Sequence, residues 1–332
     1  MVWRDQKAGP MHIVVLMPVR DDWASAAELV LQLDKAVSAG TCAMDVLFVD
    51  DGSAEPCRPA EFQSDLTAIR SLRVLRLRRN VGHQRAIAIG LAYLHHDQAL
   101  AYDAVMVMDA DGEDTAQGAW QLISAFATSQ GKQAVFAARS RRTESLSFRL
   151  FYVSYKILHR LLTGVSVRVG NFSILPFSSL STLTVMSELW NHYAAAVYRS
   201  GLPRATVPIP RGHRIAGASR MNFVSLAAHG ISAISVFGDV AGVRILAGSI
   251  ACSVLAALGI VVVLAIRLFT SRAIPGWATY AAGTLAIILI QLIAIAGSFT
   301  FTLLSNRINF GFVPARDYEL FVAGTQDVYC RD

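Results

Sequence analysis

Charged residues are scarce in this chain, and their scarcity excludes an ordinary soluble protein. Asp, Glu, Lys and Arg together make up 16% of the 332 residues, whereas hydrophobic residues make up 54%. The mean hydropathy is +0.43. Soluble domains are typically about 25% charged, so this composition indicates membrane-spanning segments. The net charge of +6 is carried mostly by arginine and favours phosphorylated substrates or an anionic membrane surface over nucleic acid.

Cysteine is scarce as well, and the four cysteines form no Cys-x-x-Cys pair. The sequence therefore predicts neither a disulfide framework nor a zinc site, which suits a reducing cytoplasm. A signal peptide is not expected, because the first apolar run, residues 13–17, is too short for one. We also find no internal repeat and no low-complexity tract.

Short apolar runs alternate with helical segments along the first part of the chain. The runs cover residues 12–17, 45–49, 72–77, 105–108 and 134–138. Runs that are apolar throughout indicate a parallel sheet with helices on both faces. Each run ends in charged or polar residues, and such sheets bind ligands beyond the carboxyl ends of their strands. We therefore expect an α/β domain with its binding site at that edge.

The fourth apolar run leads into a cluster of carboxylates. Asp109, Asp111, Glu113 and Asp114 lie within six residues. Carboxylates this close raise one another's pKa unless a cation lies among them. Oxygen ligands at alternate positions, Asp109, Asp111 and Glu113, predict a Mg²⁺ or Mn²⁺ ion that also binds a substrate diphosphate. The alternative is an acidic loop that is solvated by water.

A predicted helix follows the third run. Gly82, Ala86 and Gly90 lie at four-residue spacing, which places small side chains in one stripe and lets the helix approach the sheet closely. Asn80 and His83 stand where this helix begins. Either side chain could cap the helix or contact a ligand there.

The order of four motifs resembles the inverting family 2 glycosyltransferases with a GT-A fold. These motifs are Pro18-Val19, Asp50-Asp51-Gly52-Ser53, Asn80-x-Gly82 and Asp109-Ala110-Asp111. More narrowly, the chain resembles the polyprenyl-phosphate glycosyltransferases, relatives of dolichol-phosphate mannose synthase. Two later segments resemble motifs of that branch, namely Gly170-Asn171-Phe172 and Arg214-x-x-Gly217-x-Ser219-Arg220. The resemblance covers residues 12–304.

The resemblance implies a donor sugar linked to uridine or guanosine diphosphate, a polyprenyl phosphate acceptor and a homo-oligomer. The residues that it implies for the nucleotide are Pro18, Val19, Asp21, Asp50, Asp51, Asn80 and Asp109. For Asp50 and Asp51, loop capping is the alternative. The residues that it implies for catalysis are Asp111, Arg139, Arg214 and Arg220. The three arginines would hold phosphate oxygens through their fork-shaped guanidinium groups.

Several positions depart from the usual motifs of the family. Arg20-Asp21-Asp22 stands where Tyr-Asn-Glu is usual, Glu113 replaces a Gln, Asn171 replaces an Asp, and Arg220 replaces a Lys. Asn171 gives no support to a role that needs a carboxylate. A lipid phosphate is already ionised at neutral pH and attacks without a general base, so this acceptor tolerates the change. Arg149 is a weaker phosphate-binding candidate, and Arg141, Arg142 and Arg211 could simply hold anionic lipid.

The C-terminal half predicts a membrane anchor. Residues 222–240 have the period of an amphipathic helix lying in the membrane interface. Residues 245–266 and 277–304 are uncharged and long enough to span a bilayer, and a short connection makes them a hairpin. Arginines are more numerous beside the ends of the hairpin than in its connection, which places the catalytic part in the cytoplasm, at the inner membrane.

These boundaries divide the chain into a catalytic domain (1–221), an interfacial helix (222–240), two transmembrane helices (241–304) and a cytoplasmic C-terminal tail (305–332). Two other functions stay open. The enzyme could transfer sugar to a glycolipid or polysaccharide hydroxyl, although we see no clear catalytic base and no Gln-x-x-Arg-Trp motif of processive synthases. The chain could also be an inactive nucleotide-binding partner of a transporter or flippase.

Overall fold

The computed structural model describes residues 10–37, 42–62, 65–97, 101–139, 157–165, 169–216, 230–270, 276–308 and 311–331. The chain divides into two compact units. Unit 1 contains Met1–Leu146, Val167–Val236 and Phe312–Asp332. Unit 2 contains Ser147–Ser166 and Phe237–Gly311.

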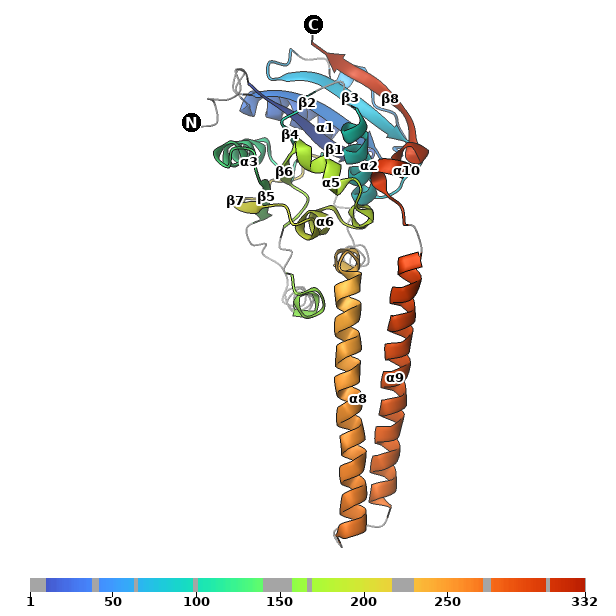
Figure 1. Ribbon diagram of the computed structural model, residues 1–332. Coiled ribbons are helices and arrows are strands. Elements are labelled where there is room, and N and C mark those ends of the chain that lie inside the picture. The colour runs from blue at the N-terminus through green and yellow to red at the C-terminus, as the bar shows by residue number, and fades with distance from the viewer. Residues whose placement is uncertain are drawn as a thin grey trace. The chain divides into compact units, whose positions relative to one another are not determined.

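Unit 1 is built on an eight-stranded sheet with the order β7-β5-β6-β4-β1-β2-β3-β8 (Figure 1). Its strands are β1 (Met11–Val19), β2 (Cys42–Asp50), β3 (Ile69–Leu77), β4 (Ala104–Val107), β5 (Ala134–Arg139), β6 (Ser173–Pro176), β7 (Arg204–Ile209) and β8 (Val322–Cys330). β1 pairs in parallel with β2 and β4, β2 with β3, and β5 with β7. β6 and β8 pair antiparallel with their neighbours. The expected mostly parallel α/β sheet is confirmed, and its five predicted strands are β1 to β5.

Helices cover both faces of this sheet. The longer helices are α1 (Trp23–Ala36), α2 (His83–His96) and α3 (Ala116–Thr128). The shorter ones are α5 (Leu180–Leu183), α6 (Tyr193–Arg199) and α10 (Pro314–Asp317), with 3₁₀ turns η2 (Pro59–Phe62), η3 (Phe177–Ser179), η4 (Ser187–Trp190) and η5 (Tyr318–Phe321).

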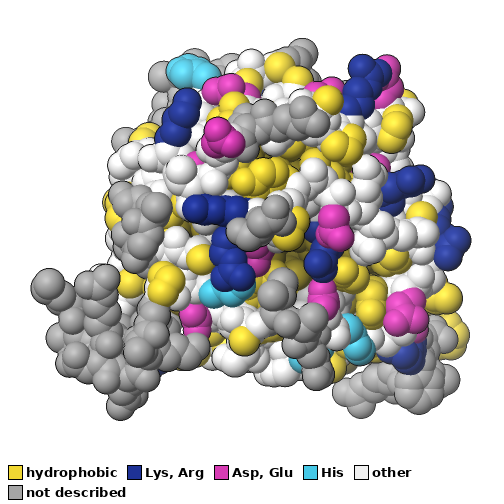
Figure 2. All heavy atoms as spheres, turned by 90° about the horizontal axis from the view of Figure 1, so that it is seen from above, with side chains coloured by type: hydrophobic (Ala, Val, Ile, Leu, Met, Phe, Trp, Pro, Cys, Tyr) yellow, Lys and Arg dark blue, Asp and Glu magenta, His cyan; other side chains and the backbone are white. Residues whose placement is uncertain are grey.

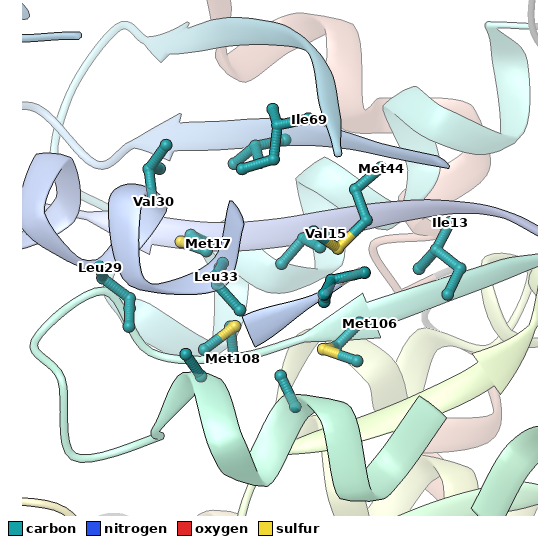
Figure 3. Packing of buried hydrophobic residues seen from close by; sticks show 14 of the residues in the cluster. Ile13, Val15, Met17, Leu29, Val30, Leu33, Met44, Ile69, Met106 and Met108 are labelled. Carbon is teal, nitrogen blue, oxygen red and sulfur yellow. The ribbon is translucent and has the colours of Figure 1, made fainter. Parts of the chain in front are cut away.

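Two hydrophobic cores result, one on each face of the sheet. In β1, Val15 and Met17 belong to the core under α1 and α3, whereas Val14 and Leu16 belong to the core under α2. Successive strand residues point to opposite faces, so a strand buried on both faces must be apolar throughout. Figure 3 shows Leu33 of α1 close to Met17 in the first core.

Asp34, near the end of α1, is a buried carboxylate that holds the start of β3. Its two oxygens accept hydrogen bonds from the backbone N–H groups of Thr67, Ala68 and Ile69 at 2.8 to 3.0 Å. The hydroxyl of Thr67 donates a further bond at 3.0 Å. Burial raises the pKa of Asp34, but these hydrogen bonds lower it more, and the net pKa lies below the usual value.

The small-residue stripe of α2 has two separate causes. A Cβ on Gly90 would lie 2.7 Å from both Leu16 Cδ1 and Val49 Cγ2, so glycine is needed here for close packing on the sheet. Gly82 has no atom within 4 Å of an added Cβ but has a φ of +94°. Glycine is therefore needed at position 82 for its backbone conformation, and not for the packing that the spacing predicts.

Unit 2 is dominated by two long helices that pack side by side, α8 (Gly238–Phe269) and α9 (Trp277–Ile308) (Figure 1). Their most apolar segments reach mean hydropathies of 2.7 and 2.2, and both helices are long and apolar enough to cross a membrane. They contain the two predicted spans. Of the predicted interfacial helix, residues 222–229 lie outside the described residues, residues 230–235 are helical, and residues 238–240 begin α8.

The C-terminal range 305–332 is not a separate tail. α9 continues to Ile308, and β8 returns to unit 1, where it pairs with β3. Arg73 of β3 also binds Asp327 of β8, with 3.0 Å between Nε and Oδ1. The polar composition that suggested a tail reflects an edge strand, most of whose side chains are exposed or half-buried.

Candidate functional site

The loops after β1 and β2 form one side of the predicted edge. Val19 and Asp50 are partners in the parallel register, and the backbone N–H of Asp51 donates to the carbonyl of Val19 at 2.9 Å. Asp21 has a φ of +55°. Its N–H donates to the Ser53 hydroxyl at 3.0 Å, and its carboxylate accepts from the N–H of Ala54 at 2.6 Å. The two loops are therefore joined through Asp21, which the resemblance implies for the nucleotide.

Asp50 and Asp51 have defined structural partners in these loops. Asp50 accepts from the N–H of Ser53 at 2.8 Å. Asp51 accepts from the N–H groups of Val81 and Gly82 at 2.6 and 3.0 Å, and so fixes the entry to α2. Burial raises the pKa of Asp51 more than these bonds lower it. Both carboxylate oxygens of Asp51 thus accept hydrogen bonds that stabilise the loop before α2.

Asn80 lies directly against this loop. An added Cβ on Gly52 would lie 2.7 Å from the backbone nitrogen of Asn80, and Gly52 has a φ of +69°. Of the other residues implied for the nucleotide, Pro18 and Val19 end β1 at the same edge. The nucleotide roles of all these residues stay predictions, but the structure brings the residues together.

The carboxylates of the acidic loop that follows β4, residues 109–114, have different roles. Asp114 is buried and accepts from the N–H of Asp109 at 2.9 Å, which stabilises the turn. Asp111 accepts from the N–H of Glu113 at 3.0 Å. Burial and the charge of Asp109 raise the pKa of Asp111, while Arg214 and Arg211 partly offset that rise. Asp109 and Asp111 are therefore the pair of carboxylates that crowd each other.

Two arginines from a distant segment pair with carboxylates of this acidic loop. Arg214 lies 3.2 Å from Asp111 through Nη1 and 2.9 Å from Asp22 through Nη2. Arg211 forms an ion pair with Glu113. The sequence placed Arg214 at a phosphate but offered a lipid surface for Arg211, and it gave no role to Asp22.

We call residues 210–216 the arginine strap. The backbone N–H groups of Gly212 and Ile215 donate to the carbonyls of Glu113 and Asp111, each at 2.9 Å. A Cβ on Gly212 would lie 2.6 Å from the carbonyl oxygen of Gly112. The strap and the acidic loop are thus in backbone contact, so the arginines are placed by the fold and not only by side-chain attraction.

We expect Gly212→Val to lower sugar transfer about a hundredfold, because the added side chain forces the strap away from the acidic loop and misplaces both arginines. Initial rates in a transfer assay measure the loss. Gly324→Val on β8 is the matched control, since an added Cβ there meets no atom within 4 Å. Equal rates for the two variants would show that the strap does not position the reacting groups.

His83, at the first position of α2, also reaches the acidic loop. Its Nε2 lies 3.1 Å from Asp109 Oδ1 and 3.0 Å from the amide nitrogen of Asn171. Burial lowers the pKa of His83, but the nearby carboxylates, first Asp109 and then Asp114, raise it more, so its net pKa lies above the usual value. The sequence placed His83 only at the start of a helix, where capping and ligand contact were equal alternatives.

The predicted metal site of Asp109, Asp111 and Glu113 stays a prediction. Within the described ranges, no three His, Cys, Asp or Glu side chains gather as a metal site. Glu113 is engaged by Arg211. Mg²⁺ commonly binds through one or two carboxylates together with substrate phosphates, so Asp109 and Asp111 alone fit such an ion.

The side chains of several predicted arginines lie outside the described parts of the chain. Arg139 ends β5, where its backbone pairs with Ile209, but its side chain is not described. Among the arginines considered above for phosphate or lipid, Arg141, Arg142, Arg149 and Arg220 lie outside the described residues. On the face shown in Figure 2, basic side chains of the described residues lie among acidic ones.

Known proteins resemble this chain in sequence. Residues 14–184 match the family model described as glycosyl transferase family 2. The uncharacterized glycosyltransferase YkcC of Bacillus subtilis is 23% identical over 271 residues, which cover 80% of each chain. The uncharacterized glycosyltransferase YkoT of the same organism is 28% identical over 198 residues, covering 58% of this chain and 56% of YkoT.

Solved structures also resemble this chain. Glucosyl-3-phosphoglycerate synthase from Mycobacterium tuberculosis, in complex with Mn²⁺, uridine diphosphate and glucosyl-3-phosphoglycerate, matches with a TM-score of 0.48 and 18% identity, over 72% of this chain and 83% of that one. Mannosyl-3-phosphoglycerate synthase from Rubrobacter xylanophilus matches with a TM-score of 0.44 and 13% identity, over 68% and 72%.

Proposed function

This chain belongs to glycosyl transferase family 2, and we propose that it moves a sugar from a nucleotide-sugar donor to the phosphate of a polyprenyl lipid, with undecaprenyl phosphate as the first acceptor to test. Membership of the family makes it a nucleotide-sugar-dependent glycosyltransferase. The acceptor is our proposal. The observation that carries it is the contact between the arginine strap and the acidic loop, which brings cationic side chains for phosphates beside carboxylates for a cation.

The carboxylates Asp109 and Asp111 are proposed to hold Mg²⁺ or Mn²⁺. Such an ion, when bound, neutralises negative charge that grows on the departing nucleoside diphosphate. Arg214 now shares its guanidinium group between Asp111 and Asp22. We propose that it turns this fork to phosphate oxygens when substrate binds, because charge-assisted pairs of this geometry are strong and directional. Arg139 and Arg220 are proposed as further phosphate contacts.

The proposed reaction needs no general base, because the lipid phosphate that accepts the sugar is already an anion. An oxygen of the lipid phosphate attacks the anomeric carbon and forms the new C–O bond. The bond from that carbon to the nucleoside diphosphate breaks, and the leaving group takes the electron pair. Attack from the opposite face inverts the anomeric centre. No proton has to be removed from the acceptor, so Asn171 need not be a carboxylate. The residues of the chain act by aligning the acceptor phosphate with the nucleotide-sugar donor.

The two apolar helices support a membrane location for this reaction. α8 and α9 are each long enough to span a bilayer. We propose that they anchor the enzyme in the inner membrane with unit 1 in the cytoplasm, where nucleotide sugars are made, and that the enzyme is a homo-oligomer. The arginines near the hairpin ends support this orientation through the positive-inside rule.

A direct transfer assay tests the proposal. The full-length protein in lipid nanodiscs is incubated with undecaprenyl phosphate, Mg²⁺ or Mn²⁺ and a panel of UDP- and GDP-sugars, and the lipids are examined by mass spectrometry. We expect a lipid-linked sugar from one donor. Transfer only to undecaprenol or a glycolipid would replace the proposal with a hydroxyl acceptor. Donor binding without transfer to any of these acceptors would indicate an inactive nucleotide-binding subunit and would overturn it.

A further inference from the structure

We propose that Asn171 is a specificity residue that donates hydrogen bonds to the ionised phosphate of the acceptor, in an orientation set by Gln84. The inference rests on the proposed function and extends it to a residue whose type departs from the usual motif. It depends on the orientation of the side-chain amides of Gln84 and Asn171, which a backbone N–H group of α6 fixes.

The direction of this chain of hydrogen bonds is set by the backbone N–H of Tyr193, which can only donate. The backbone N–H of Tyr193 donates to Oε1 of Gln84 at 2.7 Å. The other end of the same amide, Nε2, therefore donates to Oδ1 of Asn171 at 3.1 Å. Asn171 must then turn its NH₂ group the other way, toward His83, where the two nitrogens lie 3.0 Å apart. Tyr193 is fully buried, so the anchor of this chain is fixed.

This NH₂ group lies beside the acidic loop. His83 Nε2, which faces Asn171, is also 3.1 Å from Asp109 Oδ1. The single nitrogen can donate to Asp109 or accept from Asn171, but it cannot do both at once. None of the described side chains takes the second amide hydrogen of Asn171. In either state of His83, at least one N–H of Asn171 is therefore available to a ligand.

An available N–H selects the chemistry of its partner. An ionised phosphate oxygen accepts hydrogen bonds and needs no deprotonation before it attacks, so it matches an amide donor. A hydroxyl acceptor would need a group that takes its proton during attack, and an amide cannot serve as that base. The amide thus favours a phosphate acceptor over an alcohol at this position.

Binding measurements test the inference without sugar transfer. The full-length protein in detergent micelles is titrated with farnesyl phosphate, farnesol or UDP by isothermal titration calorimetry. Asn171→Leu removes the donors without adding charge. We expect it to weaken farnesyl phosphate binding about tenfold and to leave farnesol and UDP binding unchanged, because hydrogen bonds to charged groups are the strong ones.

Gln84→Glu tests the orientation from a distance. One oxygen of Glu would accept from Tyr193 and the other from the NH₂ group of Asn171, so the Asn171 amide would flip and present its oxygen to the ligand. We expect the same tenfold, phosphate-selective loss. Gln32→Glu on α1 adds the same charge at an exposed position and should bind farnesyl phosphate as the wild type does. Circular dichroism confirms that each variant is folded.

The outcomes separate this inference from the proposed function. Full affinity for farnesyl phosphate in Asn171→Leu or in Gln84→Glu would overturn the inference, even if the enzyme transfers sugar to lipid phosphate. A loss confined to UDP would assign Asn171 to the donor diphosphate and overturn the acceptor assignment. A phosphate-selective loss would support the inference even if the transfer assay yields no product, and only the proposed function would then fail.

Discussion

Asp111→Asn is expected to lower sugar transfer by at least about a hundredfold without unfolding the protein. The carboxylate is proposed to hold the divalent ion and, in the present structure, it also pairs with Arg214 at 3.2 Å. An amide of the same shape keeps the acceptor for the N–H of Glu113, so the loop should keep its turn. Initial rates measure the loss, and electron paramagnetic resonance of Mn²⁺ measures binding of the ion directly.

The Mn²⁺ measurement separates the metal role of Asp111 from its ion pair. We expect Asp111→Asn to weaken Mn²⁺ binding in the absence of any sugar donor. Asp65→Asn, an exposed aspartate before β3, is the matched control and should bind Mn²⁺ and turn over as the wild type does. Wild-type Mn²⁺ affinity in Asp111→Asn would remove Asp111 from the proposed metal site, whatever happens to the rate.

Asp34→Ala should lower the free energy of unfolding of unit 1 by about 3 to 5 kcal/mol. The change leaves the backbone N–H groups of Thr67, Ala68 and Ile69 without their acceptor, and Ala68 and Ile69 are buried. Urea denaturation followed by tryptophan fluorescence measures the effect, since Trp23 is buried in the same helix. Glu28→Ala, an exposed change on α1, should alter stability by less than about 0.5 kcal/mol.

The contribution of Asp34 also predicts a pH dependence. Its folded pKa lies below the usual aspartate value of 3.8. A carboxyl group with a lowered folded pKa adds stability above its unfolded pKa, and this stability is lost as the pH falls through the folded pKa. The difference in unfolding free energy between wild type and Asp34→Ala should therefore be constant above about pH 5 and should shrink below about pH 4. A difference that persists unchanged at pH 2 would contradict this account.

The sequence predicted the strands whose residues are buried on both faces. β1, β2, β4 and β5 are mostly apolar runs because their residues are buried on both faces, whereas β3 carries arginines among its apolar residues, and this signal is local. β7 alternates between exposed and half-buried residues along most of its length, and β8 is largely exposed, so neither has that signal. β6 has only four residues. The positions of these three strands depend on pairing with distant segments, which composition does not encode.

In the candidate site, too, the sequence predicted local features and missed contacts between distant segments. Asp109 and Asp111 stand out because like charges are adjacent in sequence. The partnership of Arg211 with Glu113, and that of Gln84 with Asn171, joins segments from different parts of the chain. No spacing rule connects such residues. What the sequence did offer was a set of departures from the usual motifs, and Glu113 and Asn171 both turn out to have specific partners.

The order of elements along the chain has a consequence for biosynthesis. α8 and α9 are both made after β7 and before β8, yet β8 pairs with β3 in the sheet of unit 1. While the ribosome is still making the hairpin, the outer edge of β3 has no strand to pair with. An uncovered strand edge is a site for wrong pairing, so a nascent chain in which completion of the hairpin is delayed also remains exposed to aggregation and to chaperones.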